Sequence, residues 1–241
     1  MPPEFEIRRE VELPANPEQG WAAVATGEGL ASWMFPVGTG EATGTGEVFA
    51  GHAVTAFDPP RHLAVRAEGP DGWFNALEYL IEARDGGTVV LRYVHSGVFA
   101  GDWENQYDAA GQHTDFYLHS LGQYLRYFTG RRVSYIAAEG PAASEAAGAF
   151  DAVRQALGLT GTSAAGDPVR AELPGLEPLD GVVDYAAPNF LGVRTADGLY
   201  RFFGRNAFGM RVGLGHHLFG GGVDEDKARL GWQSWLTGLY R

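Results

Sequence analysis

Apolar and polar residues alternate along the first stretch of the chain. Phe5, Ile7 and Leu13 share one parity, and charged residues, four glutamates and Arg8, fill the other. A period of two is typical of a β-strand with one buried and one solvated face. Arg9 falls on the apolar parity. We therefore expect Arg9 to lie at a sheet edge, to pair with a glutamate such as Glu78 or Glu82, or to hold a ligand carboxylate.

Two short helices are expected directly after this strand. Asn16 has the chemistry of a helix N-cap, and Pro17 suits the first helical position. Trp21 belongs to the apolar stripe of the first helix, and Leu30 and Trp33 to that of the second. The pattern therefore predicts a strand followed by two helices that close on a tryptophan.

Over the next hundred residues the pattern predicts strands first and then one long helix. Asp85-Gly86-Gly87 separates the runs Trp73–Ala83 and Thr88–Ser96, as a hairpin connection does. The glycine-rich segment 38–46 lacks the lysine of a phosphate-binding loop and predicts another hairpin. Apolar residues at helical spacing then predict a helix that begins between Trp103 and Gln112 and ends at Gly130.

The remaining residues repeat this outline in a shorter form. We expect a strand over Val133–Ala138, a helix over Ser144–Leu159 capped by Ser144, and a final helix over Asp224–Tyr240 whose apolar residues include Leu230. Five short strands are expected between the two helices: Val169–Leu173, Gly181–Tyr185, Phe190–Thr195, Leu199–Arg205 and Phe208–Leu214. The sequence thus predicts a degenerate tandem repeat with domains over 1–131 and 132–241.

Composition narrows the range of partners. The net charge is −12, from 30 acidic and 18 basic residues, which disfavours nucleic acid and anionic membrane surfaces. No apolar run approaches the ~18 residues of a membrane span, and no signal segment is evident, so no membrane insertion and a cytoplasmic location are expected. The absence of cysteine excludes thiol catalysis and thiolate zinc sites.

The N-terminal pattern carries a family resemblance. The run Val11-Glu-Leu-Pro-Ala-Asn-Pro-Glu, then Trp21 and Gly29-Leu-Ala-Ser-Trp33, resembles the opening of START-like (SRPBCC) domains. It is most similar to the bacterial branch related to the activator of heat-shock protein 90 ATPase. Two further segments match, Gly87-Thr-Val-Val-Leu and His95-Ser-Gly-Val-Phe99. The likeness covers residues 4–130 well and is only architectural beyond them.

The resemblance implies an α+β helix-grip fold. In that fold a curved antiparallel sheet wraps around a long C-terminal helix, with a cavity between them; here a second, shorter START-like half would follow. It specifies function poorly, because fold does not imply function.

Aromatic and polar residues of the first half are candidates for the lining of such a cavity. A concave sheet that faces a helix leaves a volume for side chains to fill or to line. His95 could also orient a ligand carbonyl, act as a general base, or simply bind the loop before the long helix. The candidate ligand-binding residues are Trp33, Phe35, Trp73, Tyr79, Tyr93, His95, Trp103, His113, Phe116, Tyr117, Ser120 and Tyr124.

Metal and cofactor chemistry is not indicated. His113 and His119 are six residues apart, whereas two ligands on one helix face need a spacing of three or four. Asp115 and His119 have that spacing, but two ligands alone do not make a site. We expect no metal and no cofactor.

Three functions remain open from the sequence. The favoured one is binding of a small apolar or aromatic molecule between the sheet and the long helix. The alternatives are a cyclase or dehydratase that uses the same cavity, with His95 as base, and a chaperone-associated interaction module with a protein partner. The sequence leaves open a monomer or a homodimer.

Overall fold

A computed structural model describes residues 4–37, 48–49, 51–98 and 103–241. The chain divides into two compact units, residues 1–129 and 130–241. Each unit is described by itself below. The predicted hairpin over 38–46 lies outside the described residues.

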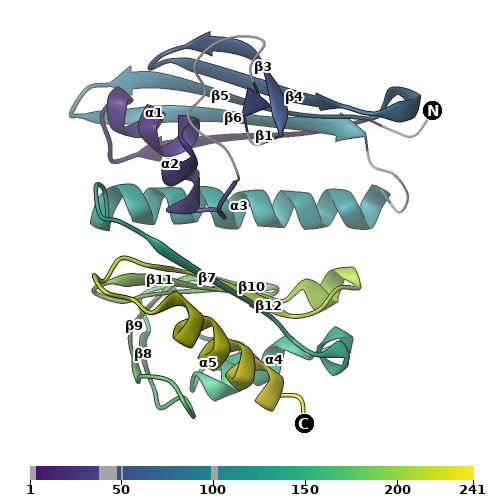
Figure 1. The fold of residues 1–241 in the computed structure, drawn as a ribbon, viewed down its shortest axis with the longest axis vertical. Coiled ribbons are helices and arrows are strands. Elements are labelled where there is room, and N and C mark those ends of the chain that lie inside the picture. The colour runs from purple at the N-terminus through teal and green to yellow at the C-terminus, as the bar shows by residue number, and fades with distance from the viewer. Residues whose placement is uncertain (1–3, 38–47, 50, 99–102) are drawn as a thin grey trace. The chain divides into compact units, whose positions relative to one another are not determined.

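The first unit is built on a six-stranded antiparallel sheet (Figure 1). The order across the sheet is β1-β6-β5-β4-β3-β2, so the first strand pairs with the last. The strands are β1 (Glu4–Leu13), β2 (Val48–Phe49), β3 (His52–Asp58), β4 (His62–Glu68), β5 (Phe74–Arg84) and β6 (Thr88–Val98), with a 3-10 turn, η1 (Pro70–Gly72), before β5. The predicted hairpin around residues 85–87 is confirmed as the β5–β6 connection.

Three helices complete the first unit: α1 (Pro17–Ala25), α2 (Gly27–Ala31) and α3 (Trp103–Tyr127). The predicted cap of α1 is confirmed, because Asn16 Oδ1 accepts from the Gln19 N–H at 2.8 Å and Gln19 Oε1 accepts from the Asn16 N–H at 3.0 Å. This reciprocal pair satisfies two backbone donors that a helix start otherwise leaves free. The helix α2 ends at Ala31, so Trp33 lies past its end.

One face of this sheet forms the core of the unit. Leu63, Ile81 and Leu91 from the sheet pack with Val24 of α1 and Leu121 of α3. In Figure 1 the long helix α3 runs along this face, with α1 and α2 beside it. The helix-grip architecture predicted for this part of the chain, an antiparallel sheet gripping a long C-terminal helix, is confirmed.

The second unit repeats the strand order of the first. Its sheet runs β7-β12-β11-β10-β9-β8, again with the first strand paired to the last. The strands are β7 (Ser134–Glu139), β8 (Pro168–Ala171), β9 (Leu179–Ala187), β10 (Phe190–Arg194), β11 (Gly198–Phe203) and β12 (Gly213–Leu218); the helices are η2 (Ala142–Glu145), α4 (Phe150–Ala156), η3 (Arg205–Phe208) and α5 (Glu225–Gly238). The second half is therefore a shorter version of the same α+β plan.

This unit has a core of its own. Phe150 of α4 and Trp235 of α5 pack with Val193 and Phe202 from the sheet. Asp224 caps α5 by accepting from the Lys227 N–H at 3.0 Å. The predicted domains 1–131 and 132–241 and their independent folding stay predictions.

Two element predictions for the second half are wrong. The helix over 144–159 is confined to α4, because Gly148 takes a left-handed conformation with φ 75° that interrupts any helix. Ser144 does not cap it; its hydroxyl instead accepts from the Val212 N–H at 3.3 Å. The strand expected over 208–214 begins only at Gly213, since residues 205–208 form η3.

The buried face of α5 also differs from the prediction. Leu230 is 61% exposed, whereas Trp232, Trp235 and Leu236 are buried. Their spacing of three and four residues defines one helix face, and Leu230 lies off it. Among the described residues, no helix is both long enough and apolar enough to cross a membrane.

Candidate functional site

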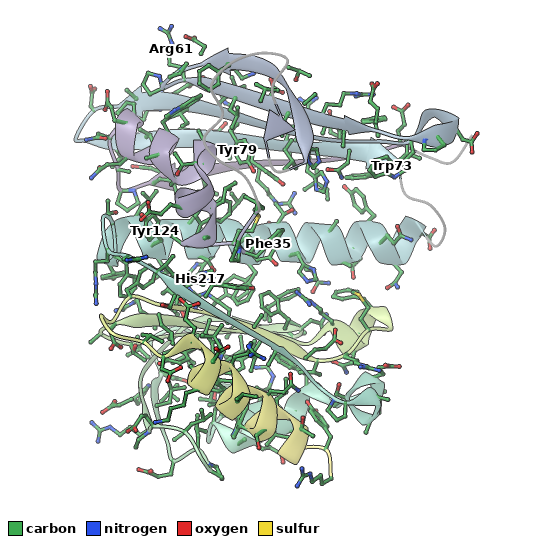
Figure 2. All side chains as sticks on the ribbon, in the orientation of Figure 1. Phe35, Arg61, Trp73, Tyr79, Tyr124 and His217 are labelled. Carbon is green, nitrogen blue, oxygen red and sulfur yellow. The ribbon has the colours of Figure 1, made fainter. Side chains whose placement is uncertain are left out.

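The first unit encloses a cavity of about 310 Å³ between the sheet and α3. Strands β3 to β6 form one wall, and α2, the segment after it and α3 form the others. The lining residues are Leu30, Met34, Phe35, Val37, His52, Val65, Asn75, Leu77, Tyr79, Tyr93, His95, Ala110, His113, Thr114 and Tyr117. Figure 2 shows Tyr79 between the sheet and α3, and Phe35 next to α3.

The sheet wall follows from strand register. In β5, Asn75, Leu77 and Tyr79 alternate onto the face that carries the core. Across the antiparallel ladder Leu77 is opposite His95, and Tyr79 is opposite Tyr93. Because successive side chains of a strand point to opposite faces, these residues must enter the same space.

Two histidines and an amide form a hydrogen-bonded chain in this wall. His52 Nε2 lies 3.1 Å from Asn75 Oδ1, and Asn75 Nδ2 lies 2.8 Å from His95 Nε2. An amide oxygen only accepts and an amide nitrogen only donates. His52 is therefore the donor at one end of the chain, and His95 is the acceptor at the other.

Burial keeps His95 neutral. Loss of solvation, followed by the nearby His52, lowers the pKa of His95 to about 4. The ring packs edge-on against Phe5, with centroids 4.9 Å apart. At neutral pH this imidazole is therefore an uncharged polar group in an apolar wall.

Two phenols add polar groups that are also uncharged. Burial raises the pKa of Tyr79 above its ordinary value. Burial likewise raises the pKa of Tyr93, as does its neighbour Tyr79, while a hydrogen bond with Thr114 acts in the opposite direction. The rings of Tyr79 and Tyr93 lie 5.3 Å apart between centroids.

Aromatic rings also line the helix side of the cavity. Phe35 packs edge-on against Tyr117 of α3, with centroids 6.0 Å apart, and Tyr117 is 6.1 Å from His113. His113 Nδ1 donates to the Ala109 carbonyl at 2.8 Å. Phe35 is 41% exposed, so this row of rings reaches the molecular surface.

The ionisable side chains in the described lining of the cavity are histidines and tyrosines. Among the described residues that line it, none is Asp, Glu, Lys or Arg. Arg9 of β1 pairs with Asp115 of α3 at 2.5 Å and 3.2 Å. Of the alternatives that the sequence left open, the edge position holds, because β1 is the first strand of the sheet order; Arg9 pairs with a residue of α3 and not with Glu78 or Glu82.

Six of the predicted site residues meet around this cavity, and the others do not. Phe35, Tyr79, Tyr93, His95, His113 and Tyr117 line it. Trp33 is core, its indole N–H donating to the Ala23 carbonyl at 2.9 Å. The Ser120 hydroxyl donates to the Phe116 carbonyl at 2.9 Å, and neither residue lines the cavity. Contact of any of these residues with a ligand stays a prediction.

Two more predicted residues, Trp73 and Tyr124, lie outside the cavity lining. Trp73 is 37% exposed and follows the η1 turn, and Figure 2 shows it well apart from Phe35. Tyr124 packs against the apolar core. The Trp103 side chain lies outside the described part of the structure.

Sequence reasoning missed Asn75, which bonds to His95, and His52, which bonds to Asn75. The parity of β5 could have identified Asn75, because it alternates with Leu77 and Tyr79. No sequence signal identifies His52, which reaches the site from β3, at the far side of β4 and β5 in the sheet. Within the described ranges no group of three or more His, Asp or Glu residues could hold a metal ion.

The second unit has a more polar hollow beside α5. Its volume is about 520 Å³, and Glu177, Asp224 and Lys227 contribute to its lining together with Tyr200 and Trp232. Charged side chains at its rim distinguish it from the uncharged cavity of the first unit.

Comparison with known proteins gives likenesses of fold. No protein-family model matches the chain, and no curated protein matches it in sequence. The chain is similar to the solution structure of the Aha1 dimer from Colwellia psychrerythraea, with 21% identity, a TM-score of 0.42, and coverage of 52% of this chain and 99% of that chain.

Two other solved structures match nearly the whole chain. One is DynU16, a protein of the dynemicin biosynthetic locus, with 14% identity, a TM-score of 0.42, and coverage of 98% of this chain and 95% of that chain. The other is the di-domain ARO/CYC BexL from the BE-7585A biosynthetic pathway, with 13% identity, a TM-score of 0.42, and coverage of 96% and 93%. These likenesses concern the fold alone, which strand order and α3 already define in this chain.

Proposed function

We propose that the first unit binds a small hydrophobic or aromatic molecule in the cavity between its sheet and α3. The observation that carries this proposal is the cavity itself, about 310 Å³ in volume and lined mainly by apolar and aromatic side chains. Pockets for small molecules are typically concave and apolar, with a few placed polar groups. The hydrogen-bonded side chains of Asn75 and His95 and the phenol of Tyr79 would be those polar groups.

The size of the cavity suits a molecule of about two fused rings. A cavity of roughly 150 Å³ lined by apolar side chains accommodates benzene, and this one has about twice that volume. Flat rings would pack against Tyr117 and Phe35, whose edge-to-face arrangement is the one aromatic pairs prefer.

A cyclase or dehydratase that uses His95 as base has less support. Nε2 of His95 already accepts a hydrogen bond from Asn75 at 2.8 Å, and a pKa of about 4 makes the ring a weak base at neutral pH. The described cavity lining holds no carboxylate that could serve instead. An interaction module is also less supported, because two of the exposed aromatics of the unit, Phe35 and Trp73, lie apart on it (Figure 2). The cytoplasmic location and the monomeric or homodimeric state stay predictions.

The test is native mass spectrometry of the purified protein, followed by denaturing extraction and identification of small molecules. We expect a near-stoichiometric apolar compound. Leu77→Trp should fill the cavity and abolish retention of the compound, since Leu77 lines the cavity wall. Leu80→Trp is the matched control, because Leu80 lies on the opposite face of the same strand.

Both variants should keep the wild-type circular dichroism spectrum. Equal retention by Leu77→Trp and the wild type would place the ligand elsewhere and refute the proposal. An empty wild-type protein that also takes up no hydrophobic fluorescent dye would refute it as well.

A further inference from the structure

We infer that Asn75 holds His95 as its Nδ1–H tautomer, so that the cavity offers its ligand an uncharged hydrogen-bond donor and selects uncharged molecules that carry an acceptor oxygen. This inference rests on the proposed function, because it concerns the ligand of the same cavity. Asn75 acts here as a positioning residue, through its bond to His95.

The tautomer follows from the direction of the hydrogen bonds. His52 Nε2 approaches Asn75 Oδ1 at 3.1 Å, which orients the amide with its nitrogen toward His95 Nε2 at 2.8 Å. The amide nitrogen donates, so His95 Nε2 must be unprotonated. A neutral imidazole whose Nε2 is unprotonated carries its proton on Nδ1.

Because Nε2 of His95 is already bonded to Asn75, the N–H at Nδ1 is the group of this ring that can bond to a ligand. Within the described residues, no hydrogen bond to His95 Nδ1 is formed. The ring faces Phe5 at 4.9 Å and Tyr93 at 6.4 Å between centroids, and Asn75, itself bonded to His52, lies on its Nε2 side. A ligand that reaches this wall therefore meets a donor, with no fixed charge beside it.

This arrangement discriminates among ligands. A carbonyl or ether oxygen can accept from Nδ1–H without bringing a charge into the cavity. A carboxylate would lose its hydration and find no cation among the described lining residues, which is strongly unfavourable. A pure hydrocarbon would leave the donor unsatisfied, and this weakens binding by about 10-fold.

The tautomer is tested directly by long-range ¹H–¹⁵N correlation spectroscopy of the full-length ¹⁵N-labelled protein at neutral pH. The His95 signals are assigned by their absence in His95→Gln. We expect the wild-type ring to be protonated at Nδ1 alone. Asn75→Asp should move the proton to Nε2 or yield an imidazolium, because a carboxylate accepts and does not donate.

Two further variants test whether Asn75 sets the tautomer of His95. Asn75→Leu cannot donate, so the His95 signals should show exchange between both tautomers. Asn105→Asp adds the same charge on α3, outside the cavity lining, and should leave the His95 signals unchanged. A wild-type His95 that is protonated at Nε2, or that already exchanges between tautomers, would overturn the inference.

Ligand selection is tested with three probes of one ring system: 2-acetylnaphthalene, 2-ethylnaphthalene and 2-naphthoate. We expect the acetyl compound to bind about 10-fold more tightly than the ethyl compound, and the carboxylate to bind more weakly than both. In Asn75→Asp protein whose spectra show the proton on Nε2 alone, the preference for the acetyl over the ethyl compound should disappear.

The outcomes separate the two proposals. Equal binding of the acetyl and ethyl compounds would overturn the inference while the cavity keeps its proposed binding function. No binding of either would overturn the proposed function and the ligand preference with it, whatever tautomer the spectra show.

Discussion

At the scale of single residues, burial decides the protonation of two histidines. His95 faces the cavity, and burial lowers its pKa to about 4. His216 is fully buried, and burial, followed by the nearby His217 and Arg201, lowers its pKa well below the ordinary value. His216 Nδ1 accepts from the Arg201 N–H at 3.1 Å, and its ring is 4.3 Å from that of Trp232. Both rings must be neutral in the folded protein.

These two histidines predict a loss of stability on acidification. In the unfolded chain a histidine has a pKa near 6.5, so the unfolded state binds more protons below that pH. The free energy of unfolding should therefore fall from about pH 6.5 downward, by roughly 1.4 kcal/mol per pH unit for each histidine, until pH approaches the lowered pKa values.

Urea unfolding at pH 7, 6 and 5 measures this slope above the range in which most carboxylates titrate. The contribution of His95 should be absent in His95→Gln, whose curve should fall less steeply. A free energy of unfolding that stays constant between pH 6.5 and 5 would contradict the assignment of both rings as buried and neutral.

At the scale of elements, the contact of α1 with α2 depends on a glycine. A Cβ added at Gly29 would lie 2.0 Å from the Ala22 carbonyl oxygen and 2.8 Å from Ala23 Cα, both backbone atoms of α1. Backbone of a packed helix cannot move aside as a flexible side chain can. The two helices carry Val24 and Leu30 into the core, and Leu30 also lines the cavity.

Gly29→Ala should therefore lower the free energy of unfolding of the first unit by about 2–3 kcal/mol and weaken ligand retention. Gly122→Ala in α3 is the matched control, because its nearest contact would be Leu13 at an ordinary 3.8 Å. The control should be neutral or stabilising, since alanine favours a helix over glycine. Equal unfolding midpoints for the two variants would refute the close approach.

Element prediction succeeded where one local signal dominates. The parity of residues 5–13 predicted β1, and the chemistry of Asn16 predicted the start of α1. It failed at Gly148 and Gly209. Each of these glycines has a left-handed φ, which interrupts an element that the sequence predicts as continuous. A left-handed φ leaves no trace in hydrophobic periodicity, because glycine is compatible with either conformation.

At the scale of the whole molecule, two units share one strand order but differ in their helices. The long helix of the first, α3, has 25 residues, whereas α5 has 14. Each unit has its own apolar core, and each core is drawn from residues of that unit alone.

A fragment that ends at Gly130 should therefore fold by itself and retain the apolar ligand. Circular dichroism, a cooperative thermal transition and native mass spectrometry check this expectation. The complementary fragment 131–241 serves as comparison and should fold without retaining that ligand. A first fragment that fails to fold would show that the halves share one core.

Local pattern predicted most of the elements, and the family resemblance of the N-terminal residues implied the fold class. Periodicity, caps and turn residues act between neighbours in the chain, so the strand of residues 5–13, the hairpin around Gly86 and the long helix could be predicted. The tertiary structure decided the site. Asn75 and His52 meet His95 only through the pairing of strands distant in sequence, and Arg9 finds Asp115 106 residues away. Such partners depend on register and on helix placement, which no local pattern encodes.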